Sequence, residues 1–208
     1  MSNCVTIIDY GIGNVKAFEN SYKRLNIPVT VASSPSELDG ATKLILPGVG
    51  AFDWAMGKLN ESGMLGKLNE LVLEREIPVF GVCVGMQMMA NSSEEGQLPG
   101  LGWIDAKVKK FADLEGKGDA KLPLPHMGWN EVIPSTDHNV FLDLHDPCFY
   151  FLHSFYFAPN RDSQILATSS YGANFTSAAA NKHIIGVQFH PEKSHDAGMQ
   201  MLLNFARL

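Results

Sequence analysis

The first half of the chain alternates short apolar runs with segments of helical period, and this alternation limits the possible folds more than any other feature. Four short runs are rich in β-branched residues or Leu: residues 5–9, 29–32, 43–47 and 77–82. The run 77–82 is apolar on both faces, as a parallel strand covered by helices must be. Between the four runs, apolar residues recur every three or four positions over 15–25 and 65–72, which predicts two helices. Strand, helix and strand in succession indicate βαβ units.

The second half contains longer strand-like runs with turn residues between them. The runs cover residues 102–111, 130–134, 148–157 and 165–171. They predict an antiparallel or mixed extension of the sheet. An apolar run at 183–190 returns to the main sheet, and a final helix carries apolar residues at 199, 202, 203 and 206. We therefore predict an α/β fold in which a single domain, residues 1–208, forms a mixed, mostly parallel sheet flanked by helices.

Composition and charge exclude several classes of function. Charged residues make up 18% of the chain, the net charge is -6 and there is no basic block, so a nucleic-acid or anionic-membrane surface is not expected. The sequence lacks an apolar run of about 18 residues and a secretion signal, which predicts a soluble, unexported protein. Cys4, Cys83 and Cys148 form no C-x-x-C pair, which argues against disulfides or zinc and for a cytoplasmic location.

The stretch GVCVG places Cys83 between Gly81 and Gly85, directly after an apolar run. A nucleophile on a sharp strand-to-helix turn needs small residues two positions away on both sides, because the two backbones approach closely there. Such a turn lifts the thiol to the carboxyl edge of the sheet and to a helix N-terminus, where the dipole favours thiolate. The alternative is that Cys83 is a small buried apolar residue.

A cysteine nucleophile needs a base and a group that orients the base. His190 and Glu192 follow the apolar run 183–190 and are two residues apart, so in an extended segment their side chains leave on the same side. Pro191 between them favours extended geometry. We predict that Glu192 accepts from one imidazole nitrogen while the other faces Cys83. The alternative is a strand end with a solvated turn.

The segment PGVG, residues 47–50, is a glycine-rich turn after a predicted strand. A peptide flanked by Gly48 and Gly50 can rotate and present the Val49 N–H to an oxyanion. The second donor would be the N–H of Val84, the residue after the nucleophile. A plain turn is the alternative.

These elements together resemble class I, triad-type glutamine amidotransferases. The resemblance extends to DYGIGN at the start, FDWAM after the glycine-rich turn, SEEG at 93–96, PHMGWN at 125–130 and HSFYF at 153–157. Across its whole length the chain is similar to the glutaminase subunits of imidazole glycerol phosphate synthases. The resemblance implies a class I amidotransferase fold with a flavodoxin-like core. It implies hydrolysis of L-glutamine to glutamate and ammonia by Cys83, His190 and Glu192, with no metal or cofactor.

The resemblance also implies roles for residues near the triad. Gln87, one helical turn after Cys83, would contact the amino-acid end of glutamine, and the HSFYF segment adds His153, Ser154 and Phe155 to the substrate site. The family more often has Leu at the position of Val84 and Tyr at that of Phe155. Val84 acts through its backbone, whereas Phe155 lacks a hydroxyl.

One domain occupied by these elements leaves no room for a second active site, so the ammonia acceptor would lie on a partner. The family's partner is a (β/α)8 cyclase, which forms a heterodimer with the glutaminase. The PHMGWN segment reads as an exposed loop, and we predict that it contributes interface residues together with a cation next to the triad. The predicted interface residues are His126, Met127, Trp129, Asn130 and Lys193. Alternatively, Trp129 folds back into the core and Lys193 is a solvated charge.

Other functions remain possible from the sequence. They are a paralogous glutaminase that supplies ammonia for surface-polysaccharide amidino-sugars, another Cys-dependent hydrolase, and a silent binding module. α/β-Hydrolases place the acid before the histidine, whereas Glu192 follows His190. A silent module would usually have a damaged triad, and this one is intact.

Overall fold

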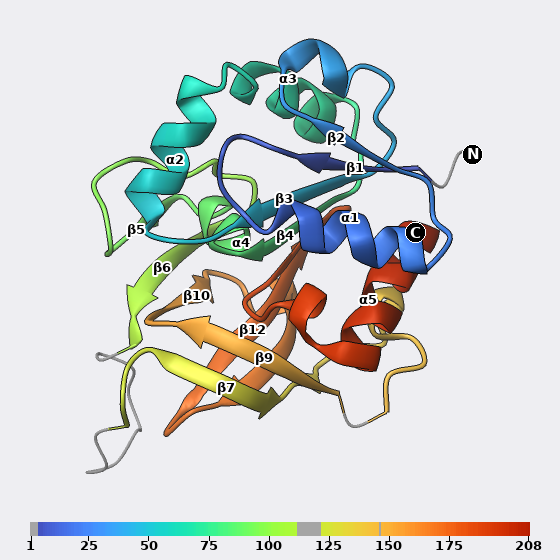
Figure 1. Ribbon diagram of the computed structural model, residues 1–208. Coiled ribbons are helices and arrows are strands. Elements are labelled where there is room, and N and C mark those ends of the chain that lie inside the picture. The colour runs from blue at the N-terminus through green and yellow to red at the C-terminus, as the bar shows by residue number, and fades with distance from the viewer. Residues whose placement is uncertain (1–3, 112–121, 146) are drawn as a thin grey trace.

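The computed structural model describes residues 4–111, 122–145 and 147–208, and a parallel sheet forms its centre (Figure 1). Its strands are β1 (Val5–Ile8), β2 (Val29–Ala32), β3 (Leu44–Gly48), β4 (Val79–Cys83) and β13 (Ile184–Val187). They lie in the order β2-β1-β3-β4-β13, and all neighbours are parallel. Every residue of β1, β3, β4 and β13 is buried, as expected for strands covered on both faces. The predicted mostly parallel α/β sheet is confirmed.

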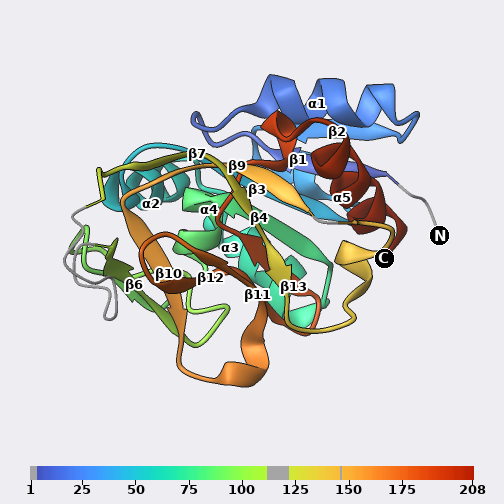
Figure 2. The same ribbon diagram turned by 90° about the horizontal axis from the view of Figure 1, so that it is seen from below.

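The helices cover both faces of this sheet. They are α1 (Val15–Arg24), α2 (Phe52–Glu61), α3 (Leu65–Asn69), α4 (Val84–Met88) and α5 (His195–Arg207). The chain runs from β1 outward to β2, but from β3 in the opposite direction to β4. Because parallel crossovers share one hand, α1 lies on one face and α2 and α3 lie on the other. α5 packs against α1, and α4 packs against α2 (Figure 2).

An antiparallel extension continues the sheet beyond β13. It consists of β12 (Asn174–Asn181), β10 (Phe155–Pro159), β6 (Ala106–Lys110) and β5 (Ser92–Ser93), with β11 (Ile165–Ser170) and β8 (Ile133–Pro134) branching from β12. β5 pairs with β6 in the parallel sense. A second sheet is the antiparallel pair β7 (His126–Glu131) and β9 (Cys148–His153). It packs against β12, where the ring centroids of Phe151 and Phe175 are 5.9 Å apart, and β7 also contacts β11. Figure 1 shows β7 and β9 side by side.

Short helical turns connect these elements. They are η1 (Pro35–Leu38), the π-helix η2 (Glu70–Glu74), η4 (Asn139–Phe141), η5 (Asp162–Gln164) and η6 (Pro191–Lys193). The helix predicted over 65–72 is therefore α3 continued by η2. No helix in the described parts of the chain combines the length and apolar character needed to cross a bilayer.

β12 and α2 are among the elements that were not predicted, and one predicted strand is divided. β12 has the sequence NFTSAAAN, whose Ala, Ser and Asn residues have weak strand propensity, yet its six central residues are buried. α2 was recognised only as the motif FDWAM, without its helical nature. The run 148–157 breaks at Ser154, because β9 pairs with β7 whereas β10 pairs with β6 and β12. The break places Ser154 and its neighbours beside the end of β4.

Candidate active site

Cys83 sits at the turn between β4 and α4 with φ 55° and ψ -114°, a conformation rare for any residue other than glycine. The turn is possible because the residues in closest contact around it, Gly48, Gly81 and Gly85, have no side chain. A Cβ at Gly81 would lie 2.9 Å from the carbonyl oxygen of Gly85. One at Gly85 would collide with the Leu46 carbonyl oxygen of β3, and one at Gly48 would collide with the Gly85 nitrogen. The predicted close approach at Gly81 and Gly85 is confirmed.

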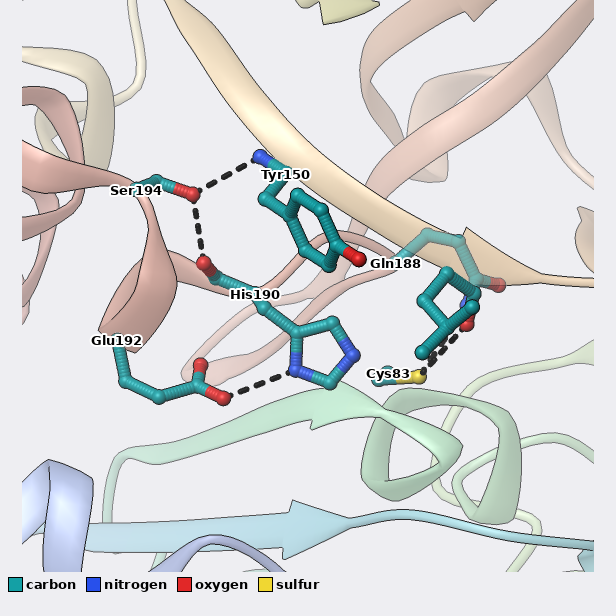
Figure 3. Close-up of polar contacts among 7 residues, drawn as sticks. Cys83, Tyr150, Gln188, His190, Glu192 and Ser194 are labelled. Carbon is teal, nitrogen blue, oxygen red and sulfur yellow. Dashed lines mark hydrogen bonds and ion pairs between the residues drawn. The ribbon is translucent and has the colours of Figure 1, made fainter. Parts of the chain in front are cut away.

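His190 reaches Cys83 because their strands are neighbours. In the parallel pair β4–β13, Val187 lies opposite Val82, so both strands end at the same edge of the sheet. His190 Nδ1 lies 2.9 Å from Glu192 Oε1, and both side chains are buried. The imidazole lies between the Glu192 carboxylate and Cys83 (Figure 3).

The local geometry of this pair differs from the prediction. Residues Pro191–Lys193 form the 3₁₀ helix η6, not an extended segment, and the turn brings Glu192 back under His190. Ser194, which sequence reasoning missed, fixes this turn on β9: its Oγ donates to the His190 carbonyl at 2.6 Å and accepts from the Tyr150 N–H at 3.0 Å (Figure 3). The His190 N–H donates to the Tyr150 carbonyl at 2.9 Å.

The protonation of His190 is set by opposing effects. Burial lowers its pKa, but hydrogen bonds to Cys83 and Glu192, with the negative charges of both, raise the pKa to about 9. The imidazolium is therefore favoured at neutral pH. A proton donor thus lies next to the sulfur, and Glu192 holds it in place.

A cavity of about 310 Å³ opens in front of the sulfur. Its wall contains Val49, Gly50, Cys83, Val84, Gln87, Glu95, Pro125, Leu152, His153, Ser154, Phe155, His190 and Lys193. The structure thus brings the predicted oxyanion turn and the predicted substrate residues to one cavity. Gly48 lies behind the wall against α4, and Gly50 has φ +87°. The described residues contain no group of three or more His, Cys, Asp or Glu side chains suited to a metal ion.

Glu95 is a cavity residue that the sequence did not single out beyond its place in SEEG. Its carboxylate accepts from the N–H of Phe52, the first residue of α2, at 2.9 Å. Burial raises the pKa of Glu95, and the nearby charge of Asp53 adds to the rise. Asp53 in turn accepts from the N–H groups of Gln97 and Leu98 at distances from 2.8 to 3.0 Å. These contacts fasten the loop that carries Glu95 to the start of α2, beside the oxyanion turn.

Two buried glutamines lie behind the nucleophile. The Gln87 side chain donates to the Phe155 carbonyl at 3.2 Å and to Gln188 Oε1 at 3.0 Å. Gln188 Nε2 lies 3.9 Å from Cys83 Sγ. Phe155 therefore contributes its backbone carbonyl to the site, a role that does not need a ring hydroxyl. The sequence placed Gln87 near the substrate but missed Gln188.

Comparison with known proteins agrees with this geometry. The family model for glutamine amidotransferase class-I matches residues 6–207. The chain belongs to the class I glutamine amidotransferases. It is 55% identical over 206 residues to the "Imidazole glycerol phosphate synthase subunit HisH" of Bdellovibrio bacteriovorus, covering 98% of this chain and 100% of that one. It is 49% identical to the protein of that name from Leptospira interrogans, again covering 98% and 100%.

Solved structures show the same fold. A crystal structure of a glutamine amidotransferase superposes with a TM-score of 0.74 at 19% identity, covering 98% of this chain and 99% of that one. A glutamine amidotransferase from Thermotoga maritima gives a TM-score of 0.63 at 18% identity, covering 100% and 97%.

In this class I glutamine amidotransferase, the segment PHMGWN is not the predicted exposed loop. Its residues from His126 onward form β7, which pairs with β9 in register from His126↔His153 to Glu131↔Cys148. Side chains alternate across a strand, so Met127 and Trp129 share one side and are 65% and 49% exposed. Trp129 therefore does not fold into the core; its ring stacks on His195 with centroids 5.1 Å apart.

The same alternation turns His126 inward, so its side chain is not on the exposed face of β7 with Met127 and Trp129. His126 is buried, and its Nδ1 lies 2.9 Å from His153 Nε2. Burial lowers the pKa of His126 to about 4 and that of His153 to about 3, so both rings are neutral. Asn130 shares the face of His126 but is half-buried, and it donates to the Ser170 carbonyl at 2.8 Å. Of the five predicted interface residues, Met127, Trp129 and Lys193 are exposed.

Proposed function

We propose that this amidotransferase hydrolyses L-glutamine to glutamate and ammonia with Cys83 as nucleophile, His190 as proton carrier and Glu192 as its orienting group. The observation that carries the proposal is the buried imidazole of His190, bonded to Glu192 at 2.9 Å and facing Cys83 at the cavity wall.

Each residue has one role in the reaction. The Cys83 thiolate attacks the side-chain amide carbon of glutamine and forms a tetrahedral oxyanion. His190 then gives its proton to the amide nitrogen as the C–N bond breaks, which releases ammonia and leaves a thioester. Neutral His190 next takes a proton from water, whose oxygen attacks the thioester to release glutamate. Glu192 fixes the tautomer and stabilises the imidazolium in both half-reactions.

The cavity supplies the remaining contacts for glutamine. The N–H groups of Val49 and Val84 lie on the turn and at the start of α4, where they suit the oxyanion. The carboxylate of Glu95 has the charge to bind the α-ammonium group of glutamine, and Lys193 has the charge to bind its α-carboxylate. Gln87 completes this end of the site.

We further propose that the ammonia serves imidazole glycerol phosphate synthesis in the histidine pathway, on a (β/α)8 cyclase that forms a heterodimer with this chain. Support comes from relatives named as HisH subunits at 55% and 49% identity over the full chain. Support also comes from the surface beside the cavity, where Met127 and Trp129 are exposed and Lys193 lies over the Tyr150 ring at 5.8 Å. The names of these relatives do not favour the amidino-sugar alternative.

The test uses Cys83→Ala in the complex of this chain with the cyclase. Glutamate release should fall to a few per cent of wild type or less, because no other group at the cavity replaces the thiolate. With ammonia supplied at high pH, the complex should still form imidazole glycerol phosphate, since the variant keeps the fold and the partner. Substantial glutamine hydrolysis by Cys83→Ala would contradict the assignment of Cys83 as nucleophile. A partner that uses an amidino-sugar precursor would contradict the assignment to the histidine pathway.

A further inference from the structure

The side chain of Gln188 is fully buried and lies beside the proposed nucleophile. It follows β13, two residues before His190, and its Nε2 is 3.9 Å from Cys83 Sγ. Its Oε1 accepts from Gln87 Nε2 at 3.0 Å. A buried amide needs partners for both of its ends, and here one end is bonded to Gln87 and the other faces the sulfur. Figure 3 shows this side chain approaching Cys83 from the side away from Glu192.

The Phe155 carbonyl fixes the direction in which both amides point. It can only accept hydrogen bonds, and it receives one from Gln87 Nε2 at 3.2 Å and a second from His153 Nδ1 at 2.8 Å. Reversing the Gln87 amide would bring its oxygen against this carbonyl oxygen. The second N–H of Gln87 therefore faces Gln188 and requires an oxygen there. Consequently, the N–H end of Gln188 is the end that faces the sulfur.

Among the described residues, two groups besides His190 make hydrogen-bond contacts with the sulfur, and they favour opposite protonation states. The Leu152 carbonyl, 3.8 Å from Sγ, can only accept from an S–H and so favours the thiol. The Gln188 N–H can only donate to the sulfur, and such a bond strengthens when the sulfur is ionised. We propose that Gln188 is a hydrogen-bond donor to the Cys83 thiolate, held in the donating orientation by Gln87 and the Phe155 carbonyl. The proposal rests on Cys83 being the nucleophile.

Other titratable groups lie near the sulfur or line the same cavity, and they remain in place when Gln188 is changed. They are His190 after β13, Tyr10 after β1, His153 on β9, and Glu95 and Lys193 in the cavity wall. The Tyr10 hydroxyl donates to the Pro47 carbonyl at 2.6 Å, and burial raises its pKa. Comparison of Gln188 variants with the wild type thus isolates the contribution of one neutral donor.

The experiment measures how fast iodoacetamide alkylates Cys83 as a function of pH, because only the thiolate reacts. Peptide mass spectrometry of the full-length chain separates Cys83 from Cys4 and the exposed Cys148, and Cys148 serves as an internal reference. Gln188→Met keeps the length of the side chain but removes the donor. It should shift the Cys83 profile upward by about one pH unit and slow alkylation about 10-fold at pH values below the wild-type midpoint. Gln188→Asn, which is too short to reach the sulfur, should act in the same direction.

The matched control is Val187→Ala. Val187 is the buried residue next to Gln188, so its substitution disturbs the local packing but leaves the Gln188 donor in place. It should lower the melting temperature without shifting the Cys83 profile. An unchanged profile in folded Gln188→Met would overturn the proposal, as would an equal shift in Val187→Ala. If Gln188→Met does not fold, Gln188→Asn carries the same test. If only the Gln188 proposal is wrong, Cys83→Ala is still unable to hydrolyse glutamine. If the proposed function is wrong, Cys83→Ala still hydrolyses it.

Discussion

At the scale of single residues, the site depends on one strained backbone position and one buried ring. A positive φ at a residue such as Cys83 costs on the order of 1–3 kcal/mol, and it persists only where the surroundings hold it. Here Gly48 of β3 and Gly81 of β4 both lie in close contact with Gly85 of α4, so the strained conformation of Cys83 is the one that fits. The result is a sulfur at the cavity wall that faces His190, whose ring is held by Glu192.

The first prediction separates the roles of His190 and Glu192. Glu192→Gln should lower the rate of glutamine hydrolysis less than His190→Ala, by a difference on the order of 10- to 100-fold, because it keeps the proton carrier. The measurement is kcat/KM for glutamate release by the complex, with circular dichroism to establish that both variants fold. Equal losses, or a larger loss in Glu192→Gln, would mean that the roles are misassigned.

The second prediction concerns pH. The pKa of His190 is raised from 6.5 to about 9, so glutamine hydrolysis should decline as pH rises through about 9, where the proton for the leaving ammonia is lost. The same shift contributes stability that is complete below 6.5 and is lost between 6.5 and about 9. His190→Gln should lack this part of the pH dependence of the free energy of unfolding. A wild-type transition near 6.5, the ordinary value, would contradict the prediction.

At the scale of elements, the elbow depends on the close approach of β3 to α4, and β7 depends on alternation. A Cβ on Gly85 would meet backbone atoms of Leu46 and Pro47, which cannot move as a flexible side chain does. On β7, the same alternation that buries His126 exposes Met127 and Trp129 beside the cavity. Each element therefore places several residues of the site at once.

Gly85→Ala should destabilise the protein by about 1–3 kcal/mol or more, because the added methyl group forces β3 and α4 apart. Gly57→Ala on α2 is the matched control, since a Cβ there meets nothing within 4 Å. The control should be neutral or more stable by up to about 1 kcal/mol, as alanine favours helix. Urea unfolding of both variants measures the difference. Similar stabilities would show that the close approach is not required.

Trp129→Ala, alone or with Met127→Ala, should weaken binding to the cyclase by at least about 10-fold, because exposed aromatic residues often dominate interfaces. Leu73→Ala is the control: Leu73 is 52% exposed and lies on η2, before β4 and therefore away from the carboxyl edge of the sheet. Titration calorimetry gives the affinities. Unchanged binding of the Trp129 variant, or equal losses in the control, would move the interface elsewhere.

At the scale of the whole molecule, the proposed partner surface and the oxyanion turn border the same cavity. Val49 and Gly50 form one part of its wall, and Lys193 and Leu152 form another, with Leu152 opposite Met127 across the β7–β9 pair. Contact at this surface therefore lies close to the Val49 peptide, the proposed oxyanion donor. Partner binding can act as a population shift between outward and inward orientations of the Val49 peptide.

We therefore expect the isolated chain to hydrolyse glutamine about 100- to 1000-fold more slowly than the complex with its cyclase and acceptor ligand, the usual effect of one missing oxyanion donor. Steady-state glutamate release by the chain alone, with the partner, and with partner and acceptor measures the effect. A lone chain that runs at the rate of the full complex would exclude the switch and leave the triad assignment intact.

The sequence by itself determined the features that depend on residues close together in the chain. The parallel strands follow from apolar runs that must be buried on both faces, and the elbow follows from Gly81 and Gly85 around Cys83. Tertiary structure decided the rest, because it brings together residues distant in the chain. It placed β13 beside β4, turned PHMGWN into a strand that buries His126, and folded His190 to Glu192 as a 3₁₀ turn rather than an extended segment. Gln188 carried no local signal at all: its place beside the sulfur depends on the pairing of strands about 100 residues apart, and pairing of that range is set by the packed sheet, not by neighbours in sequence.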